Sequence, residues 1–397
     1  MMLNRRHFLR LSAFASGALL LPSGCAVVPT GPQTKAVAGK PETLVLVEFQ
    51  GGNDGLNTVA PIKDPLYRSL RPTLALTEAE ALPIGQDLAL HPALRPALAL
   101  WDAGDLAVVL GVGYPNPDRS HFRSIDIWDT ASDADRVLST GWITRALQTQ
   151  PRPRAADAFV LGRPHLGPVT GSGIKAVSLS NPGTFAKAAT AVSIPEMQRR
   201  NPILDQISAV QGTLRVAGDD IQNRLKAVPA SLTADFPKTN IGGQFADAMR
   251  LLAAGVEAPV IKLSLGSFDT HIDQAPQHAR LLGDFAAGLA AFRKAAQASG
   301  HWDRVILLTY SEFGRRPAEN ASKGTDHGTA APQFLAGGAV RGRLIGTQPA
   351  LDRLQNDDLV HTMDFRQVYA GLLQGIWGIA PEKVFGKPVD ATAGLIA

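Results

Sequence analysis

The chain has 397 residues, of which 45% are hydrophobic and 6% aromatic, and its formal net charge is +4 at pH 7. Part of that charge comes from arginines near the N-terminus, so the rest of the chain is near neutral and no nucleic-acid partner is expected. A chain of this length forms one large α/β domain or two smaller ones. Cys25 is the only cysteine, which excludes an internal disulfide.

The N-terminal region predicts an export signal. Arg5 and Arg6 precede an apolar stretch at residues 11–21, and small residues then lead to Cys25. A membrane-spanning helix needs about 20 apolar residues, so this stretch is too short to be an anchor. We expect a twin-arginine signal peptide over residues 1–30, the twin-arginine translocase as a partner, and no transmembrane anchor in the mature chain. A basic amphipathic helix that stays on the protein is the alternative.

Residues 21–25 also resemble a lipoprotein cleavage box, in which Cys25 becomes the lipidated first residue. Pro22 departs from that pattern, because an aliphatic residue is expected there. After the signal, residues 31–42 predict a linker and residues 43–397 predict the main domain. The mature protein is therefore expected in the periplasm or outside the cell, with a lipid anchor as an alternative.

Four short apolar runs bounded by glycine or proline predict buried parallel strands. In chain order, these runs are Thr43 to Phe49, Leu106 to Val112, Val260 to Leu265 and Val305 to Tyr310. Residues 274–298 have one apolar stripe at helical spacing, a helical insertion is predicted around residues 201–231, and residues 151–164 are interpreted as a surface connection. Strands alternating with helices predict an α/β fold, a three-layer sandwich with a mostly parallel central sheet.

Polar residues follow each predicted strand, at the edge where open α/β sheets bind ligands. Asp54 follows the first strand in a glycine-rich turn, where it is either part of an Asx turn or an oxygen ligand. Ser120 follows the second strand and begins a helical pattern. It is either an ordinary N-cap or a nucleophile stabilised by the helix end, by Arg119 and by a metal.

Further carboxylates and imidazoles follow the third and fourth strands: Asp269, His271, Glu312, Asp326 and His327. Because parallel strands end at the same edge of a sheet, we expect these side chains to lie close to one another and to Asp54. Mixed nitrogen and oxygen ligands suit zinc, manganese or calcium. The sequence therefore predicts one or two divalent ions at this edge.

Six motifs carry a family resemblance: FQGGNDGLNT, ALHPAL, DRSHFRSIDIWDT, FDTH, SEFGR and GTDHG. Together they resemble the alkaline phosphatase and sulfatase superfamily, and more closely the exported twin-arginine family catalogued as domain of unknown function 1501. The resemblance extends from about Thr43 to Ile396 and implies an alkaline-phosphatase-like fold. It also implies metal ligands at four positions: Asp54, Asp269, His271 and His327.

The resemblance further implies that Ser120 is the nucleophile. The chain departs from the pattern at residues 311–314, where Ser-Glu-Phe-Gly replaces the Ser-Asp-His-Gly of active members. Phe313 cannot bind a metal ion, and Glu312 is the candidate replacement for the aspartate.

Three functions stay open. The first is an exported metal-dependent hydrolase of small phosphate or sulfate esters, with Ser120 as nucleophile and Arg119 or Arg315 binding the anion. The second is a non-catalytic binding or assembly protein on a degenerate fold, motivated by Phe313, whose ligand is an extracellular polymer or another exported protein. The third is a phosphomutase or transferase, which passes the phosphoryl group to an alcohol instead of water.

Overall fold

The structure, a computed structural model, describes residues 39–179 and 221–396. All of these residues belong to one compact unit, Pro32–Ala397. Several predictions fall outside the described ranges and stay predictions: the signal residues Arg5 and Arg6, the lipidation site Cys25 and the first part of the helical insertion. Within that insertion, residues 221–227 are helical.

The described part of the chain is built on a nine-stranded sheet in the order β13-β5-β12-β9-β1-β8-β6-β7, with β14 paired to β5. The strands are β1 Thr43–Phe49, β5 Leu106–Gly113, β6 Ala158–Leu161, β7 Ala176–Leu179, β8 Val260–Leu265, β9 Val305–Tyr310, β12 Ala331–Ala336, β13 Leu344–Ile345 and β14 Met363–Asp364. Only β12 is antiparallel to its neighbours among them. The four predicted strands and the mostly parallel sheet are confirmed.

Both faces of the sheet are covered, and this explains why the sequence of β1 is almost continuously apolar. All seven positions of this strand are buried. Leu44 and Leu46 pack into one hydrophobic cluster, whereas Val45, Val47 and Phe49 pack into the cluster on the opposite face. Successive side chains of a strand point to opposite faces, so a strand buried on both sides needs an apolar residue at nearly every position.

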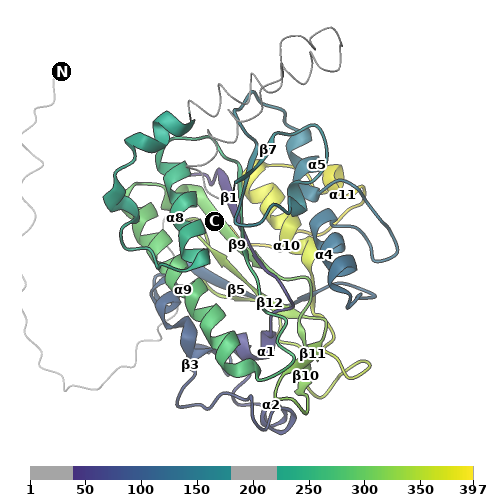
Figure 1. The fold of residues 1–397 in the computed structure, drawn as a ribbon. Helices are drawn as coiled ribbons and strands as arrows, with labels where there is room; N and C mark the ends of the chain where they lie inside the picture. Colours follow the sequence, from purple (N-terminus) through teal and green to yellow (C-terminus); the bar gives the residue numbers. More distant parts are fainter. Residues whose placement is uncertain (1–38, 180–220, 397) are drawn as a thin grey trace, which may run out of the picture. The chain divides into compact units, whose positions relative to one another are not determined.

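Helices form the two outer layers (Figure 1). The long helices α8, Asn240–Ala253, and α9, Gln274–Ala298, cover one face. Three helices cover the other: α4 His121–Thr130, α5 Trp142–Gln148 and α10 Phe365–Leu372. The predicted three-layer α/β sandwich is therefore confirmed, and α9 begins and ends at the predicted residues.

The remaining elements are short. The helical turns are α1 Gly55–Thr58, α2 Pro65–Leu70, η1 Pro92–Ala97, α3 Leu98–Asp102, η2 Gly167–Val169, η5 Ala230–Thr233, η6 Trp302–Arg304, η7 Leu373–Trp377 and α11 Glu382–Phe385. Two small sheets are formed by β2 Val59–Ala60, β3 Leu82–Gly85 and β4 Leu88–Leu90, and by β10 Arg315–Glu319 and β11 Thr325–His327. In residues 39–179 and 221–396, every helix is too short or too polar to cross a bilayer.

One interpretation of the sequence is wrong. Residues 151–164 were expected to be a surface connection, yet they contain β6, which is fully buried and pairs in parallel with β7 and β8. Four apolar residues between proline-rich flanks are enough for this strand because both faces of the sheet are covered.

Candidate metal centre at the carboxyl edge of the sheet

The carboxyl ends of four strands carry a cluster of histidines and carboxylates. Asp269 and His271 follow β8, Glu312 follows β9, and His121 is the first residue of α4, which follows β5. His327 ends β11, where it pairs with Arg315 of β10. The parallel strands β5, β8 and β9 thus bring together three distant parts of the sequence, and the antiparallel pair β10–β11 adds His327.

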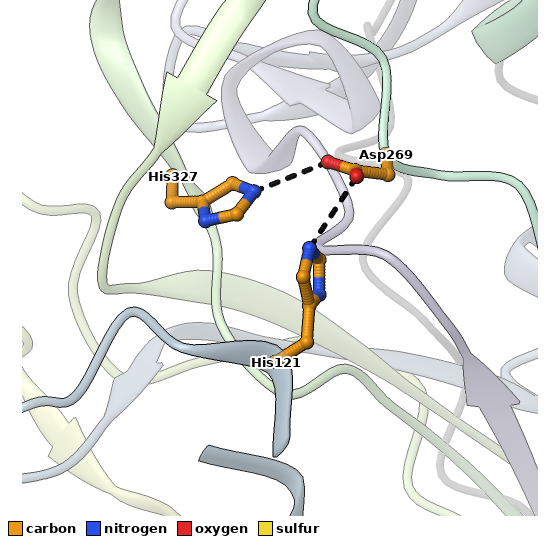
Figure 2. A group of neighbouring side chains, drawn as sticks. All are labelled: His121, Asp269 and His327. Atoms are coloured by element: carbon orange, nitrogen blue, oxygen red, sulfur yellow. Dashed lines mark hydrogen bonds and ion pairs between the residues drawn. The ribbon is translucent and has the colours of Figure 1, made fainter. Parts of the chain in front are cut away.

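The Asp269 carboxylate lies at the centre of this cluster. Its Oδ1 atom is 2.9 Å from Nε2 of His271 and 3.1 Å from Nε2 of His327, and these two nitrogens are 3.0 Å apart. Its Oδ2 atom is 3.4 Å from Nε2 of His121. Figure 2 shows the rings of His121 and His327 pointing toward the carboxylate from two sides. All three histidines therefore direct the same ring atom toward one point.

The other ring nitrogen of each histidine faces a hydrogen-bond acceptor. Nδ1 of His121 lies 2.8 Å from Glu312 Oε1, and Nδ1 of His327 lies 2.9 Å from the Arg119 carbonyl oxygen. Nδ1 of His271 is 3.5 Å from Asp326 Oδ1. In the tautomer with its proton on Nδ1, each ring would donate to this acceptor and keep its Nε2 lone pair for a metal ion, which is the usual arrangement around metal-binding histidines. Without an ion, Nε2 of His327 is within hydrogen-bond distance of Asp269 Oδ1.

The donor atoms fit a divalent cation. Ligand atoms of His121, Asp269 and His327 lie within 4.8 Å of one another. The three histidine contacts to Asp269 span 2.9 to 3.4 Å. Two ligands of one tetrahedral zinc ion lie about 3.4 Å apart when each is about 2.1 Å from the ion. The residues present therefore fit a metal ion through Asp269, His327 and either or both of the other histidines.

Electrostatics keep this carboxylate charged. Partial burial works to raise the pKa of Asp269, but hydrogen bonds from Arg315 and His327 outweigh it and hold the pKa at about 2. Burial lowers the pKa of His327, which favours its neutral, metal-binding form. The hydrogen bond to Glu312 raises the pKa of His121. Near neutral pH the cluster combines an ionised carboxylate with at least one neutral imidazole.

Arg315 is buried beneath the cluster and positions Asp269. Its side chain donates to Asp269 Oδ1 at 2.7 Å, and Nη1 lies 3.4 Å from His271 Nε2. Its remaining contacts are with the backbone carbonyl oxygens of Gly51, Gly52, Phe268 and Thr325. With 1% of its surface exposed, it presents no free donor to a ligand. The expected role of Arg315 in binding an anion is therefore not favoured by its surroundings. Arg119 is different, since 37% of its side chain is exposed and its Nη1 atom lies 3.5 Å from Asp358 Oδ2.

Asp54 is held apart from the cluster. Its carboxylate is buried, forms an ion pair with Arg71 at 2.6 Å, and accepts hydrogen bonds from the Gln274 side chain and the Asn57 N–H. Burial works to raise the pKa of Asp54, but Arg71 outweighs it, so the pKa is lowered. The contacts of Asp54 are those of an N-cap of α1 and a structural ion pair, and they include no other predicted ligand.

Ser120 lies immediately before α4 and is exposed. It occupies the N-cap position, but its side chain makes no capping hydrogen bond. Its backbone N–H donates to Asp118 Oδ1 at 2.7 Å. Its hydroxyl group is therefore not engaged in capping, and it lies next to His121 in the chain.

Phe313 forms the floor below two of the histidines. Its buried ring lies 4.9 Å from the His121 ring and 4.6 Å from the His327 ring, centroid to centroid. A Cβ atom on Gly52 would clash with this ring at 2.4 Å, so the glycine allows the close approach. The aromatic ring thus supplies an apolar surface, and no ligand atom, beneath these two histidines.

Sequence reasoning missed His121, Arg71 and Gln274 as members of this region. The signal for His121 was present, because it belongs to the same polar run after β5 as Ser120. No local signal marks Arg71 or Gln274, since both act through contacts with the distant residue Asp54.

The fold and the cluster define an α/β protein with a candidate metal centre at the carboxyl edge of its sheet. Residues 41–388 match the family described as "Protein of unknown function (DUF1501)", and the chain belongs to this family. A search of curated proteins found no match.

Several solved structures are similar to this chain. One is a protein in the alkaline phosphatase superfamily from Vibrio parahaemolyticus, with 15% identity and a TM-score of 0.40 over 92% of this chain and 75% of that one. A second is the C-terminal periplasmic domain of EcEptC from Escherichia coli in complex with Zn, with 12% identity and a TM-score of 0.32 over 76% and 73%. A third is the lipoteichoic acid synthase LtaP from Listeria monocytogenes, with 9% identity and a TM-score of 0.35 over 91% and 79%.

Proposed function

We propose that this protein is a metal-dependent hydrolase of phosphate or sulfate esters that binds one divalent ion beside Asp269. The observation that carries the proposal is the shared orientation of three histidines. Each directs Nδ1 to an acceptor and Nε2 toward the same carboxylate. Imidazole nitrogen favours zinc or manganese over calcium, which prefers oxygen ligands.

Ser120 is the proposed nucleophile. Its oxygen attacks the phosphorus or sulfur atom, the bond to the departing alcohol breaks, and water then releases the enzyme-bound group and regenerates the serine. When bound, the ion lowers the pKa of the nucleophile and neutralises charge that develops on the anion. The N-terminus of α4 also favours negative charge at this place, and the exposed guanidinium of Arg119 is the available side-chain donor.

The proposal is tested by metal content and turnover measured on the same preparation. The chain from residue 34, purified without chelator, should contain about one zinc or manganese ion and hydrolyse p-nitrophenyl phosphate or p-nitrophenyl sulfate. Ser120→Ala should abolish turnover and keep the metal, whereas Ser139→Ala, a change in an exposed loop, should alter neither. Turnover that survives Ser120→Ala would remove the assigned role of this serine.

A binding protein on the same fold is the second candidate, and Phe313 favours it. The aromatic ring lies against His121 and His327, and Asp54 is paired with Arg71, which leaves ligands for one ion. Such a protein would bind metal without hydrolysing either ester, and its ligand would be an extracellular polymer or another exported protein. Two ions per chain in the metal assay would contradict it.

Export by the twin-arginine translocase is part of the proposed function and rests on the sequence of residues 1–30. A double change of Arg5 and Arg6 to lysine should retain a fused reporter in the cytoplasm, while the unchanged signal exports it. Export of both fusions would contradict the proposed route.

A further inference from the structure

Two of the most exposed hydrophobic side chains in residues 39–179 and 221–396 lie next to histidines of the candidate metal centre. Phe122 is 89% exposed and follows His121, and Ile272 is 70% exposed and follows His271. Consecutive Cα atoms are about 3.8 Å apart, so both apolar side chains begin close to the cluster. One exposed hydrophobic residue is ordinary, but two that flank the same polar site indicate a surface that binds an apolar group.

Phe122 extends from a fixed backbone in the first turn of α4. The residue before it is anchored through its side chain, since His121 Nδ1 lies 2.8 Å from Glu312 Oε1. The residue after it is anchored as well, because Arg123 donates to the carbonyl oxygen of Arg136 at 2.6 Å. The exposed ring is therefore held at one place on the surface beside the cluster.

Ile272 is also held from both sides. The carbonyl oxygen of His271 accepts a hydrogen bond from Asn320 Nδ2 at 3.0 Å, and the N–H of Asp273 donates to the carbonyl oxygen of Ser322 at 2.9 Å. Both partners belong to the same loop, which fixes the backbone around Ile272. A side chain on a preorganised backbone loses little conformational entropy when a ligand covers it.

The same edge of the sheet offers groups for an anion. Arg119 and Ser120 directly precede His121, and 37% of the Arg119 side chain is exposed. The N–H groups at the start of α4 and an ion beside Asp269 favour negative charge at this place. Because anionic and apolar binding features lie side by side, the matching ligand carries both an anionic and an apolar group.

We propose that the ligand of this site is a phosphate or sulfate ester of an apolar alcohol, whose alkyl or aryl part lies against Phe122 and Ile272. Its anionic group lies at the metal centre. The inference rests on the proposed function for the reaction, and it names the substrate class: water cleaves the ester through Ser120, and the apolar alcohol leaves. Covering the two side chains removes apolar surface from water, which favours such an ester over an ester of a sugar.

The test is calorimetric titration of Ser120→Ala with zinc added, since this variant binds an ester without hydrolysing it. The probes are octyl phosphate and octyl sulfate, each compared with the glucose 6-ester of the same acid. The octyl ester should bind at least about tenfold more tightly, and adding Phe122→Gln or Ile272→Gln should reduce this ratio of affinities about fivefold to tenfold.

The matched control is Val137→Gln. Val137 is 80% exposed, and its loop is anchored through Arg123, Arg366 and Lys387, none of which belongs to the metal centre. The control therefore shows whether loss of any exposed apolar residue near α4 has the same effect. It should change the ratio of affinities less than twofold.

Tighter binding of an octyl ester that depends on Phe122 and Ile272 would support the inference, and the ester that binds assigns phosphate or sulfate. Equal affinities for octyl and glucose esters, the same loss in Val137→Gln, or no binding of any probe would overturn it. Binding to phosphatidylcholine vesicles that Phe122→Gln abolishes, without a preference for octyl esters, would also overturn it and assign these side chains to a membrane surface.

Turnover by the chain with Ser120 intact separates this inference from the proposed function. A Phe122-dependent preference for octyl esters in a chain that hydrolyses none of the probes would support the apolar binding surface and contradict the hydrolase. Equal hydrolysis of octyl and glucose esters would support the hydrolase and overturn the inference.

Discussion

Asp54 and Asp269 both follow a parallel strand of the same sheet, yet their surroundings differ. Asp54 is 1% exposed, and its oxygens are occupied by Arg71, Gln274 and the Asn57 N–H. The side chain of Asp269 is 46% exposed, and three histidine nitrogens point at it. One carboxylate belongs to a closed network and the other to an open cluster.

The difference shows which feature marks a ligand-binding carboxylate. A buried carboxylate that is paired with an arginine and accepts further hydrogen bonds is enclosed by protein groups, and it stabilises the fold around it. Gln274 illustrates this for Asp54: it donates to that carboxylate and accepts from Thr270 and Thr325, which precede His271 and His327. The closed network thus holds the backbone from which the open cluster extends.

The largest expected effect is a difference in the free energy of unfolding between variants of the two carboxylates. Asp54→Asn leaves Arg71 buried without its counter-ion and should lower the free energy of unfolding by about 3–5 kcal/mol. Asp269→Asn should lower it less, by about 1–3 kcal/mol, because that side chain is half exposed and the buried Arg315 loses its carboxylate but keeps its carbonyl acceptors. Urea unfolding of the metal-free variants measures both values. Equal losses would mean that the two regions do not differ as described.

The second prediction concerns His278, a buried residue whose Nε2 atom lies 3.1 Å from Oδ1 of Asn53, the neighbour of Asp54 in the chain. Burial lowers the pKa of His278 to about 4, from an ordinary value of 6.5. The folded state therefore favours the neutral ring, so this contribution is fully present above pH 6.5 and is lost as the pH falls toward 4. The shift corresponds to about 3 kcal/mol.

Unfolding of the metal-free protein between pH 7 and 4 checks this. His278→Gln keeps a donor for Asn53 and should flatten the pH dependence. Part of the slope should remain, because burial also lowers the pKa of His91 to about 4. An unchanged slope in His278→Gln would show that this ring is not buried in its neutral form.

The smallest expected effect concerns the carboxylates that accept hydrogen bonds from the Nδ1 atoms of the cluster's histidines. Glu312→Gln weakens the acceptor that orients His121 and should reduce zinc affinity about 10- to 100-fold. Asp326→Asn is the matched control, since its 3.5 Å contact with His271 is largely exposed. It should reduce affinity less than about fivefold. Competition with a chromogenic chelator measures the zinc affinity of both variants. A larger loss in Asp326→Asn than in Glu312→Gln would contradict the greater importance assigned to the Glu312 contact.

Much of the fold could be predicted from the sequence because burial on both faces leaves an unbroken apolar run. This holds for β1, β5, β8 and β9, and one apolar stripe likewise identifies α9. The antiparallel strand β12 was not predicted, since Pro332 and Gln333 interrupt its apolar pattern. Its pairing depends on β5 and β9, which lie on either side.

The site was predicted in part for a similar reason. The rule that polar residues gather where parallel strands end identified Asp269, His271 and Glu312, whereas His327 was identified in the glycine-flanked segment that follows Glu312 in the chain. The same rule also selected Asp54. The position of a carboxylate after a strand does not show whether an arginine such as Arg71 will pair with it. The rule also covers His121, which follows β5 directly after Ser120, but its contact with Glu312, 191 positions away, has no local signal in the sequence.

The central claim is that a metal ion binds beside Asp269 and not at Asp54. Anomalous X-ray diffraction at the zinc edge, on crystals of the zinc-loaded chain, tests it most directly. The account predicts one anomalous peak within about 2.1 Å of Asp269 Oδ1 or Oδ2 and of His327 Nε2. A peak at the Asp54 carboxylate, or a zinc-loaded crystal without a peak at Asp269, would contradict it.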